Sequence, residues 1–480
     1  MHFRILLASL LGLCSCAGAP AAEGPGESRY LLFQVWPAMS GYPGIPPLPG
    51  RMTLSQEQMA GFVQGLLQAI GTNGDARHKL GFTIGPLCFD LSDDETRQFI
   101  REAFTVAKEH DVAVAFHIDD SMSWGNRKDL LANPDNIECA DWNLLPCKGR
   151  RLDWGPTPTK FPPQMCYNAP AIVTAVKDRA ALIGREIKRE LAILKSEGKE
   201  YLFAAVIAGS ETQIGPDYET TRSLGFRALA HRGWSQENPP KDPDAERVAV
   251  VKEFIELWAN ALHGAGVPRE KIFCHIVFTS QGLAKRPDAS PAEKLRFAPG
   301  EVAFSTAYRP GFSTYPEGRT FKEIHDTLAE RGSPGWISAE GTNVSPTGMP
   351  GEPTMETYLG RMFNHGAVLA NIFSWGIGGD AMRENFFRQA TENPEALGAY
   401  AKFLRSEPLV ESLGFSGSEL YEKMQRIQTE LPSWIHTSGR RAEAMALMRT
   451  LQELIQEKNW RRMDEVADQL LRLSPGTPEK

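Results

Sequence analysis

The chain has 480 residues, of which 42% are hydrophobic and 23% charged, so its composition is globular and excludes collagen-like or wholly disordered structure. The formal net charge is −7, and the sequence contains no basic block or lysine-rich stripe. A nucleic-acid partner is therefore not expected, because binding to phosphates needs a positively charged face.

The first 22 residues have the pattern of an export signal. His2 and Arg4 precede the apolar run Ile5–Leu13, and small residues follow up to position 22. The run is too short to span a bilayer. The segment Leu13-Cys14-Ser15-Cys16 also resembles a bacterial lipobox. We therefore predict a secreted or periplasmic bacterial protein without a transmembrane segment, and a lipid anchor at Cys16 is the alternative.

Apolar, β-branched or aromatic runs then alternate with helical patterns. The expected strands are Tyr30–Trp36, Gly81–Phe89, Val112–Ile118, Tyr201–Gly209, Lys271–Phe278, Val302–Ala307, Gly335–Ala339 and Val368–Trp375. The expected helices begin near Thr53 and Ser92, cover Ala169–Ser196, Ala245–Gly264, Thr320–Arg331 and Thr354–Gly366, and resume from Ala381. Eight strand-then-helix units predict an α/β protein with a (β/α)8 TIM barrel. A doubly wound sheet is disfavoured because no glycine fingerprint follows the first strand.

The chain as a whole is predicted to have three parts: a signal peptide at 1–22, a barrel at 23–408 and a helical appendix at 409–480. Phe415–Leu431 and Arg440–Leu473 carry helical periodicity, with a break at Leu431-Pro432. We expect the appendix to pack on the barrel. A partner-binding or oligomerising element is the alternative, and the oligomeric state stays open.

Five cysteines follow the signal, and three of them, Cys139, Cys147 and Cys166, lie in one loop-rich stretch. An exported protein can form disulfides, so we expect one bridge among these three, although the sequence does not choose the pair. No CxxC spacing occurs, so structural zinc is not expected.

Two expected strands end in a single glutamate. The fourth ends with Gly209-Ser210-Glu211, and the seventh with Ser338-Ala339-Glu340. Period-two alternation places Glu211 on the face of Gly209, Ile207 and Ala205, and Glu340 on the face of Ser338 and Trp336. Barrel enzymes carry their active sites at these strand ends, so both glutamates are candidate catalytic residues.

With glutamates after strands four and seven, the sequence resembles glycoside hydrolase clan A over about residues 29–405. The resemblance implies a retaining glycosidase in which Glu211 is the acid/base and Glu340 the nucleophile. It also implies β-linked sugars, such as galactosides or related glycans, as substrates. Ser210 stands where members of the clan usually have asparagine.

Other strand ends suit a sugar site. Trp36 and Trp375 can stack on sugar rings, and Trp375 occupies the position where the clan often has a tryptophan floor. Tyr308 can orient the nucleophile, and His275 can face the barrel interior. Packing in the core is the alternative for His275 and for Trp36.

The third strand ends with His117-Ile118-Asp119-Asp120, and a long loop follows that contains Trp124 and Asn168. Carboxylates and imidazole suit sugar hydroxyls, so we expect His117, Asp119 and Asp120 to bind substrate. A divalent cation or a structural role is the alternative. We expect Trp124 and Asn168 to belong to a cleft wall.

The sequence thus predicts a carbohydrate-active enzyme with no cofactor and no metal. Two other functions remain open: an inverting glycosidase that uses Asp119 or Asp120, and a non-catalytic carbohydrate-binding barrel on the cell surface. The carboxyl separation discriminates between the two mechanisms, at about 5–5.5 Å for retention and about 6.5–9.5 Å for inversion.

Overall fold

The computed structural model describes residues 27–35, 53–152, 159–277, 299–314, 318–341, 354–374, 393–412, 417–435, 439–457 and 459–473. The signal peptide with Cys16, and the candidate residues Trp36 and Trp375, lie outside these ranges. No helix in the described ranges is both long and apolar enough to cross a membrane.

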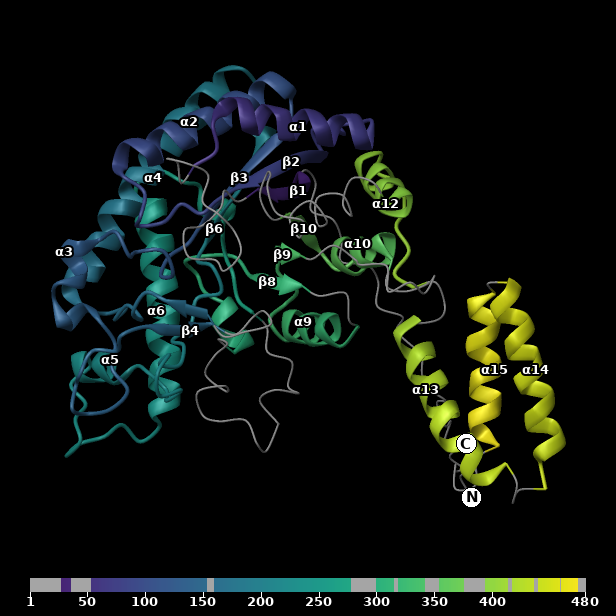
Figure 1. The fold of residues 1–480 in the computed structure, drawn as a ribbon. Coiled ribbons are helices and arrows are strands. Elements are labelled where there is room, and N and C mark those ends of the chain that lie inside the picture. The colour runs from purple at the N-terminus through teal and green to yellow at the C-terminus, as the bar shows by residue number, and fades with distance from the viewer. Residues whose placement is uncertain are drawn as a thin grey trace, which may run out of the picture.

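Eight parallel strands form the centre of the molecule (Figure 1). In chain order they are β1 (Arg29–Val35), β2 (His78–Ile84), β3 (Ala113–Ile118), β6 (Phe203–Ala208), β7 (Ile272–Cys274), β8 (Gly311–Thr314), β9 (Trp336–Gly341) and β10 (Ala367–Ser374). Each strand pairs with its neighbours, and β1 pairs with β10. Parallel bridges from Phe273 to Arg309 and from Ile276 to Phe312 join β7 to β8. The sheet therefore closes into the predicted (β/α)8 barrel.

Helices cover the outside of the barrel in the order expected for this fold (Figure 1). They are α1 (Gln56–Ile70), α2 (Asp93–His110), α4 (Pro170–Ser196), α6 (Pro243–Gly264), α9 (Gly318–Glu330), α10 (Met355–Phe363) and α12 (Pro394–Leu404). Short 3₁₀ turns η2 (Glu200–Leu202), η3 (Arg269–Lys271) and η4 (Gly300–Ala303) precede β6, β7 and β8. The capping box at Ser92 and Glu95 is confirmed, whereas α1 is capped by Ser55 with Gln58 rather than by Thr53.

The strands divide their side chains between two cores. A small inner cluster fills the barrel, and its members are Tyr30, Leu32, Ala113, Ala115, Ala204, Ala205, Ile207, Phe273, Ile337, Ala339 and Leu369. The alternate residues face the helices and join a much larger outer cluster. Because side chains alternate along a strand, the residue two positions past the last inner-cluster member of a strand is expected to face the mouth of the barrel.

The prediction for the sixth strand is wrong. Val302–Ala307 contains the second half of η4 and a connecting segment, and the strand is Gly311–Thr314. An apolar run by itself does not distinguish a buried strand from a buried turn. Gly311 marks the true strand, because a Cβ there would lie 2.1 Å from the Cys274 carbonyl oxygen of β7.

The long segment after β3 contains α3 (Lys128–Leu131), η1 (Pro134–Asn136) and the hairpin of β4 (Arg150–Leu152) with β5 (Thr159–Phe161), and α5 (Phe226–His231) follows β6. The predicted disulfide is not formed: Cys139, Cys147 and Cys166 are all free and buried. Backbone hydrogen bonds hold this segment instead, among them Cys147 N–H to the Glu138 carbonyl oxygen at 2.9 Å.

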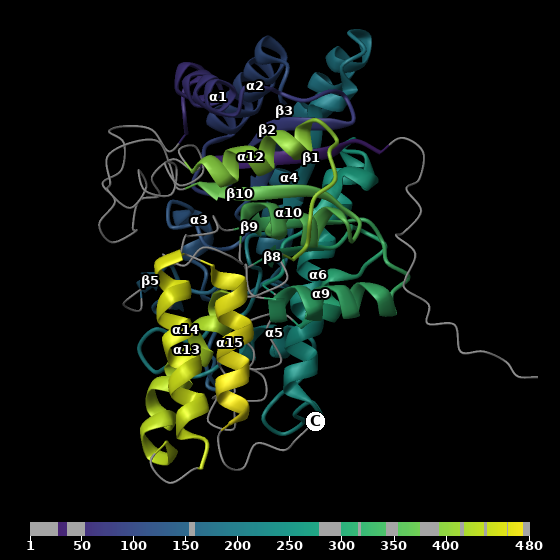
Figure 2. The same ribbon diagram turned by 90° about the vertical axis from the view of Figure 1, so that its right-hand side faces the viewer.

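The C-terminal helices α13 (Gly417–Trp434), α14 (Arg441–Glu457) and α15 (Trp460–Arg472) have a hydrophobic core of their own. Figure 2 shows α14 and α15 running alongside each other. The expected break at Pro432 is wrong, since α13 runs through it in its last turn, where only one helical hydrogen bond is lost. The segment expected as one helix from Arg440 is two, because the Asn459 side chain caps a new one.

Candidate active site

Two glutamates and one histidine meet at the carboxyl end of the barrel. Glu211 follows β6, His275 follows β7, and Glu340 lies in β9. One side-chain oxygen or nitrogen from each lies within 4.8 Å of the other two. Both glutamates are partly exposed, while His275 is fully buried. The structure therefore brings the two predicted carboxylates together at an accessible place, after the fourth strand and in the seventh strand of the barrel.

A sharp backbone turn presents Glu211. β6 ends at Ala208, Gly209 has a φ of 100°, and Glu211 itself has a φ of 50°. A residue other than glycine in this left-handed region costs about 1–3 kcal/mol and is held there by its surroundings. The Thr212 hydroxyl donates to Asp120 Oδ2 at 2.6 Å, which ties the turn to the end of β3.

We expect Gly209→Ala to lower kcat/KM at least tenfold. Its Cβ would lie 2.3 Å from Thr212 Oγ1, so the turn must move and displace Glu211. The φ of 100° adds backbone strain of about 1–3 kcal/mol. Steady-state kinetics and thermal unfolding would measure the two effects.

Gly233→Ala is the matched control. Gly233 also has a left-handed φ, of 87°, but nothing lies within 4 Å of its Cβ position. This variant should lose stability and keep its activity. Equal activity losses in the two variants would contradict the role of the Gly209 turn.

Glu340 reaches the site through a bulge in β9. Ile337 and Ala339 belong to the inner cluster of the barrel, so simple alternation would point the next residue outward. The pairing of β9 with β8 skips Ala339, and this irregularity brings Glu340 back to the inside. The expectation that Ser338 and Trp336 share the face of Glu340 is wrong, since Trp336 packs in the outer core.

Inward-facing polar side chains adjoin the two carboxylates. His275 Nε2 lies 2.7 Å from Ser313 Oγ, and His275 Nδ1 lies 3.1 Å from His117 Nε2. His117 Nδ1 lies 3.1 Å from Gln34 Oε1, which also accepts a hydrogen bond from the Asn371 amide. Burial lowers the pKa of His117 to about 4 and the pKa of His275 well below its usual value. Both imidazoles are therefore neutral at physiological pH.

The two glutamates perturb each other. Burial raises the pKa of Glu211 to about 7, although the charge of Arg150 and a hydrogen bond with Ser313 act in the opposite direction. Burial, and then the charge of Glu211, raise the pKa of Glu340 well above its usual value. Since two carboxylates this close resist simultaneous ionisation, the pair holds a proton near neutral pH.

Asp119 and Asp120 have different surroundings. Asp119 Oδ1 accepts hydrogen bonds from the Ser121 and Met122 N–H groups, whereas its buried Oδ2 has no hydrogen-bond partner. Asp120 accepts from Thr212, so it supports the turn that carries Glu211. Burial raises the pKa of both carboxyls, to about 7 for Asp120.

Three other predicted residues lie away from the two glutamates. Trp124 is fully buried in the outer core, and its indole donates to the Pro163 carbonyl oxygen at 3.0 Å. The Asn168 amide donates to the Ala228 carbonyl oxygen at 2.9 Å. Tyr308 precedes β8 instead of following it, so it lies at the opposite end of the barrel strands. The misplacement of the sixth strand explains the error for Tyr308.

Sequence reasoning missed four residues near the site, namely Gln34, Arg150, Ser313 and Asn371. A signal existed for Gln34 and Asn371, because each is a polar residue on the inward face of an otherwise apolar strand. Ser313 follows only from the correct position of β8. Arg150 has no sequence signal, since it lies in a long connecting segment.

The cluster of Glu211, His275 and Glu340 also resembles a set of metal ligands. Both nitrogens of His275 already lie within hydrogen-bond distance of other groups, Ser313 Oγ and His117 Nε2. A cation would have to displace one of these contacts. The arrangement of the described residues thus fits the chemistry of two carboxylates better than a metal centre.

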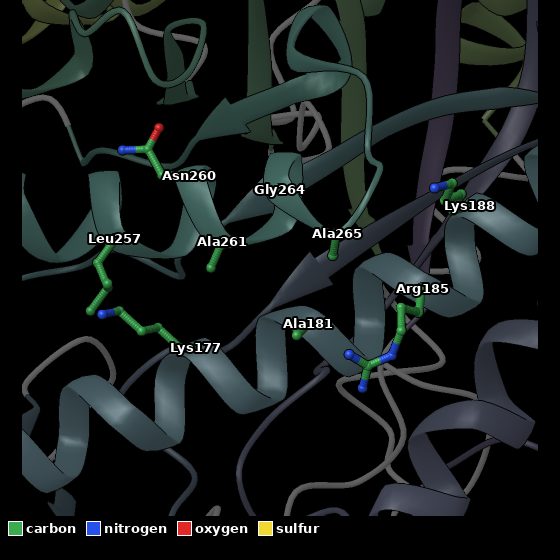
Figure 3. Close-up of a pocket in the computed structure, with 9 residues that line it drawn as sticks. All are labelled: Lys177, Ala181, Arg185, Lys188, Leu257, Asn260, Ala261, Gly264 and Ala265. Atoms are coloured by element: carbon green, nitrogen blue, oxygen red, sulfur yellow. The ribbon is translucent and has the colours of Figure 1, made fainter.

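A separate hollow lies between helices α4 and α6, on the outside of the barrel (Figure 3). Lys177, Arg185 and Lys188 line one side of it, and Leu257 and Asn260 the other. None of the described side chains at the carboxyl end of the barrel lines this hollow.

Comparisons with solved structures find distant similarities. No protein-family model matches the chain, and no curated protein matches it. The catalytic domain of a β-amylase from Paenibacillus polymyxa is 11% identical with a TM-score of 0.46, over 79% of this chain and 99% of that one. An endo-β-1,4-mannanase from Thermotoga petrophila is 8% identical with a TM-score of 0.45, over 79% and 77%. A D-allulose 3-epimerase from Methylomonas sp. is 9% identical with a TM-score of 0.35, over 79% and 96%.

Proposed function

We propose that the protein is a glycoside hydrolase that cleaves β-linked sugars with retention of configuration. The observation that carries the proposal is the separation of Glu211 and Glu340, whose carboxyl oxygens approach within 4.8 Å. Retaining glycosidases hold their carboxyl groups about 5–5.5 Å apart, whereas inverting enzymes need about 6.5–9.5 Å to admit a water molecule. The short separation favours direct attack by one carboxylate of this pair over an inverting reaction of the same two residues.

The reaction assigned to this pair has two steps. In the first, a Glu340 carboxylate oxygen bonds to the anomeric carbon, the glycosidic bond breaks, and Glu211 donates its proton to the leaving oxygen. In the second, water attacks the anomeric carbon while Glu211 takes a proton from it, and the bond to Glu340 breaks. The free sugar leaves with its original anomeric configuration.

The electrostatics of the pair suit these roles. A proton shared near neutral pH provides one carboxylic acid and one carboxylate at the start of the cycle. Once Glu340 is esterified, its negative charge is gone, so Glu211 releases its proton more readily and can act as a base. Ser313 contacts both Glu211 and His275, so it positions the acid/base against a neutral, buried imidazole.

Hydrolysis of aryl glycosides tests the proposal directly. The wild-type protein should release nitrophenol from at least one member of a panel of β-glycosides, with galactosides included. A chelator should not reduce the rate. If neither the panel nor a set of plant and algal polysaccharides is hydrolysed, the proposal fails and the non-catalytic carbohydrate-binding alternative takes its place.

We expect Glu340→Gln to raise the melting temperature more at pH 8 than at pH 5. The raised pKa values mean that the folded pair binds more protons than the unfolded chain, so wild-type stability falls as pH rises above the usual glutamate pKa. Replacing Glu340 removes the part of this loss that comes from its own raised pKa, and we expect a difference of at least about 2 °C between the two gains. The exposed Glu330→Gln on α9 should show no such dependence. Equal gains at both pH values would contradict the coupling of the two glutamates.

We also propose that the protein is exported, because residues 1–22 carry a signal pattern. Mass spectrometry of the protein recovered from a bacterial host tests this. A mature N-terminus near residue 23 supports a secreted or periplasmic protein, and a diacylglyceryl group on Cys16 supports an anchored lipoprotein. An uncleaved N-terminus would contradict both.

A further inference from the structure

Arg150 is a buried cation without a partner. Its side chain is among the largest fully buried ones, with the residue 1% exposed. Its three guanidinium nitrogens, Nε, Nη1 and Nη2, have no hydrogen-bond partner, and no ion pair to Arg150 occurs in the described part of the chain. An unpaired buried charge lowers the stability of the folded state by several kcal/mol. Such a charge is therefore expected only where it has a function that offsets this cost.

Each of the other buried arginines in the described part of the barrel has at least one partner, including Arg247, which donates to Asp244 Oδ1 although its Nε has no hydrogen-bond partner. Arg227 donates to the carbonyl oxygens of Ile137 and Leu144 and to the carboxylate of Asp135. Arg179 donates to Thr96 Oγ1 and to the Leu91 carbonyl oxygen. Among the buried arginines that the structure describes, Arg150 is therefore the one whose guanidinium nitrogens all have no partner.

The backbone holds Arg150 next to the loop that carries Glu211. The Arg150 N–H donates to the Pro162 carbonyl oxygen at 3.2 Å, and Arg150 forms a bridge with Asp217, six residues after Glu211. Gly215 makes room for the side chain, because a Cβ at that position would lie 2.9 Å from Arg150 Nε. The guanidinium group is thus built into the same loop system as the proposed acid/base.

The charge of Arg150 acts on the site. It lowers the pKa of Glu211, Asp119 and Asp120, against the larger effect of burial. Two buried acceptors in the same loops also have no hydrogen-bond partner, namely Asp119 Oδ2 and Gln213 Oε1. The Tyr167 hydroxyl donates to the Gln213 carbonyl oxygen at 2.7 Å and fixes this part of the loop. Unused donors and unused acceptors therefore occur in the loops that follow β3 and β6, and the second of these loops carries Glu211.

A buried guanidinium group together with free carboxylate and amide oxygens matches the groups of a sugar that carries an oxyanion. A guanidinium group binds a carboxylate or sulfate through parallel hydrogen bonds, and free carboxylate and amide oxygens accept from sugar hydroxyls. We propose that Arg150 binds the oxyanion of an acidic sugar, so that the substrate is a uronic-acid or sulfated glycan. This inference rests on the proposed glycosidase function, whose substrate class it specifies.

The first test uses the wild-type protein. Values of kcat/KM are compared between nitrophenyl β-D-glucuronide and β-D-glucoside, between β-D-galacturonide and β-D-galactoside, and between galactoside 6-sulfate and galactoside. We expect the acidic member of at least one pair to be preferred at least 30-fold. A preference for the carboxylate or for the sulfate identifies the oxyanion. Preference for the neutral sugar in all pairs overturns the inference.

The second test uses Arg150→Gln, Arg150→Lys and the control Lys148→Gln, which removes an exposed charge from the same segment. We expect Arg150→Gln to lose at least 30-fold on the preferred acidic glycoside and far less on its neutral partner, with Arg150→Lys in between. The control should match the wild type. Because Arg150 is unpaired, Arg150→Gln should also keep or raise the melting temperature without ligand. Equal losses on both sugars, or a large fall in melting temperature, overturn the inference.

Calorimetric binding of free D-glucuronate, D-galacturonate and galactose 6-sulfate separates the two proposals. If the wild type binds one of them, Arg150→Gln does not, and no glycoside is cleaved, the Arg150 inference stands and the glycosidase proposal fails. If neutral glycosides are cleaved and no acidic sugar binds or reacts, the glycosidase proposal stands and the inference fails.

Discussion

Glu340→Ala is expected to reduce kcat/KM for an aryl β-glycoside by about 10⁴-fold or more, because it removes the proposed nucleophile of the covalent intermediate. Azide should restore part of the rate, since the small anion fits the space that the carboxylate leaves and attacks the anomeric carbon from the same face. The product is then a glycosyl azide with inverted configuration. Steady-state kinetics and NMR of the product measure both effects.

Glu340→Gln is the matched control for azide rescue. Its side chain fills the same volume without a nucleophilic oxygen, so it should be as inactive as the alanine variant and azide should not restore it. Activity within tenfold of the wild type in Glu340→Ala would exclude Glu340 as the nucleophile. Attention would then move to Asp119, whose Oδ2 has no hydrogen-bond partner in the structure.

Glu211→Ala is expected to lose about 10²–10⁴-fold on substrates with poor leaving groups, because proton donation to the leaving oxygen is lost. Dinitrophenolate is a good leaving group and departs without a proton. The first step with a dinitrophenyl glycoside should therefore be nearly unaffected, and a burst of dinitrophenol should precede slow turnover. Azide now enters from the side where Glu211 stood and attacks the covalent intermediate. The glycosyl azide should therefore retain the configuration of the substrate.

The opposite stereochemistry of the two azide products distinguishes the roles of Glu211 and Glu340 more sharply than either rate. Asp120→Asn is a useful comparison, because Asp120 supports the Glu211 turn through Thr212 without taking a catalytic role. It should weaken activity without dependence on the leaving group. A strong leaving-group dependence in Asp120→Asn alone would move the acid role to Asp120.

Most of the fold could be predicted from sequence because its signals are local. Seven of the eight strands lie where apolar runs indicated them, and Ala205 and Ile207 face the barrel interior as alternation requires, although Glu211 itself is presented by the turn after β6. The failure at the sixth strand has a physical cause, since the buried turn at Val302 is as apolar as a strand. The four-residue β8 is instead marked by a glycine that lets two backbones approach.

The site was less predictable, because its geometry depends on contacts between distant segments. Glu340 faces inward only because a bulge interrupts the alternation of β9. The sequence of β9 contains no pattern that predicts where this bulge forms. The expected disulfide failed for a related reason. Spacing shows that cysteines are near in sequence, whereas bond formation depends on how the loop folds.

The sequence by itself determined the order of strands and helices, and with it the end of the barrel at which Glu211 and Glu340 stand, because hydrophobic periodicity is a local property. Only the tertiary structure decided that the two carboxyls approach within 4.8 Å. The burial of the Arg150 guanidinium without a partner, next to the Glu211 loop, was likewise decided only by the tertiary structure. Distances and burial depend on how the strands close into a barrel and how long loops fold over its mouth, and no spacing along the chain specifies them.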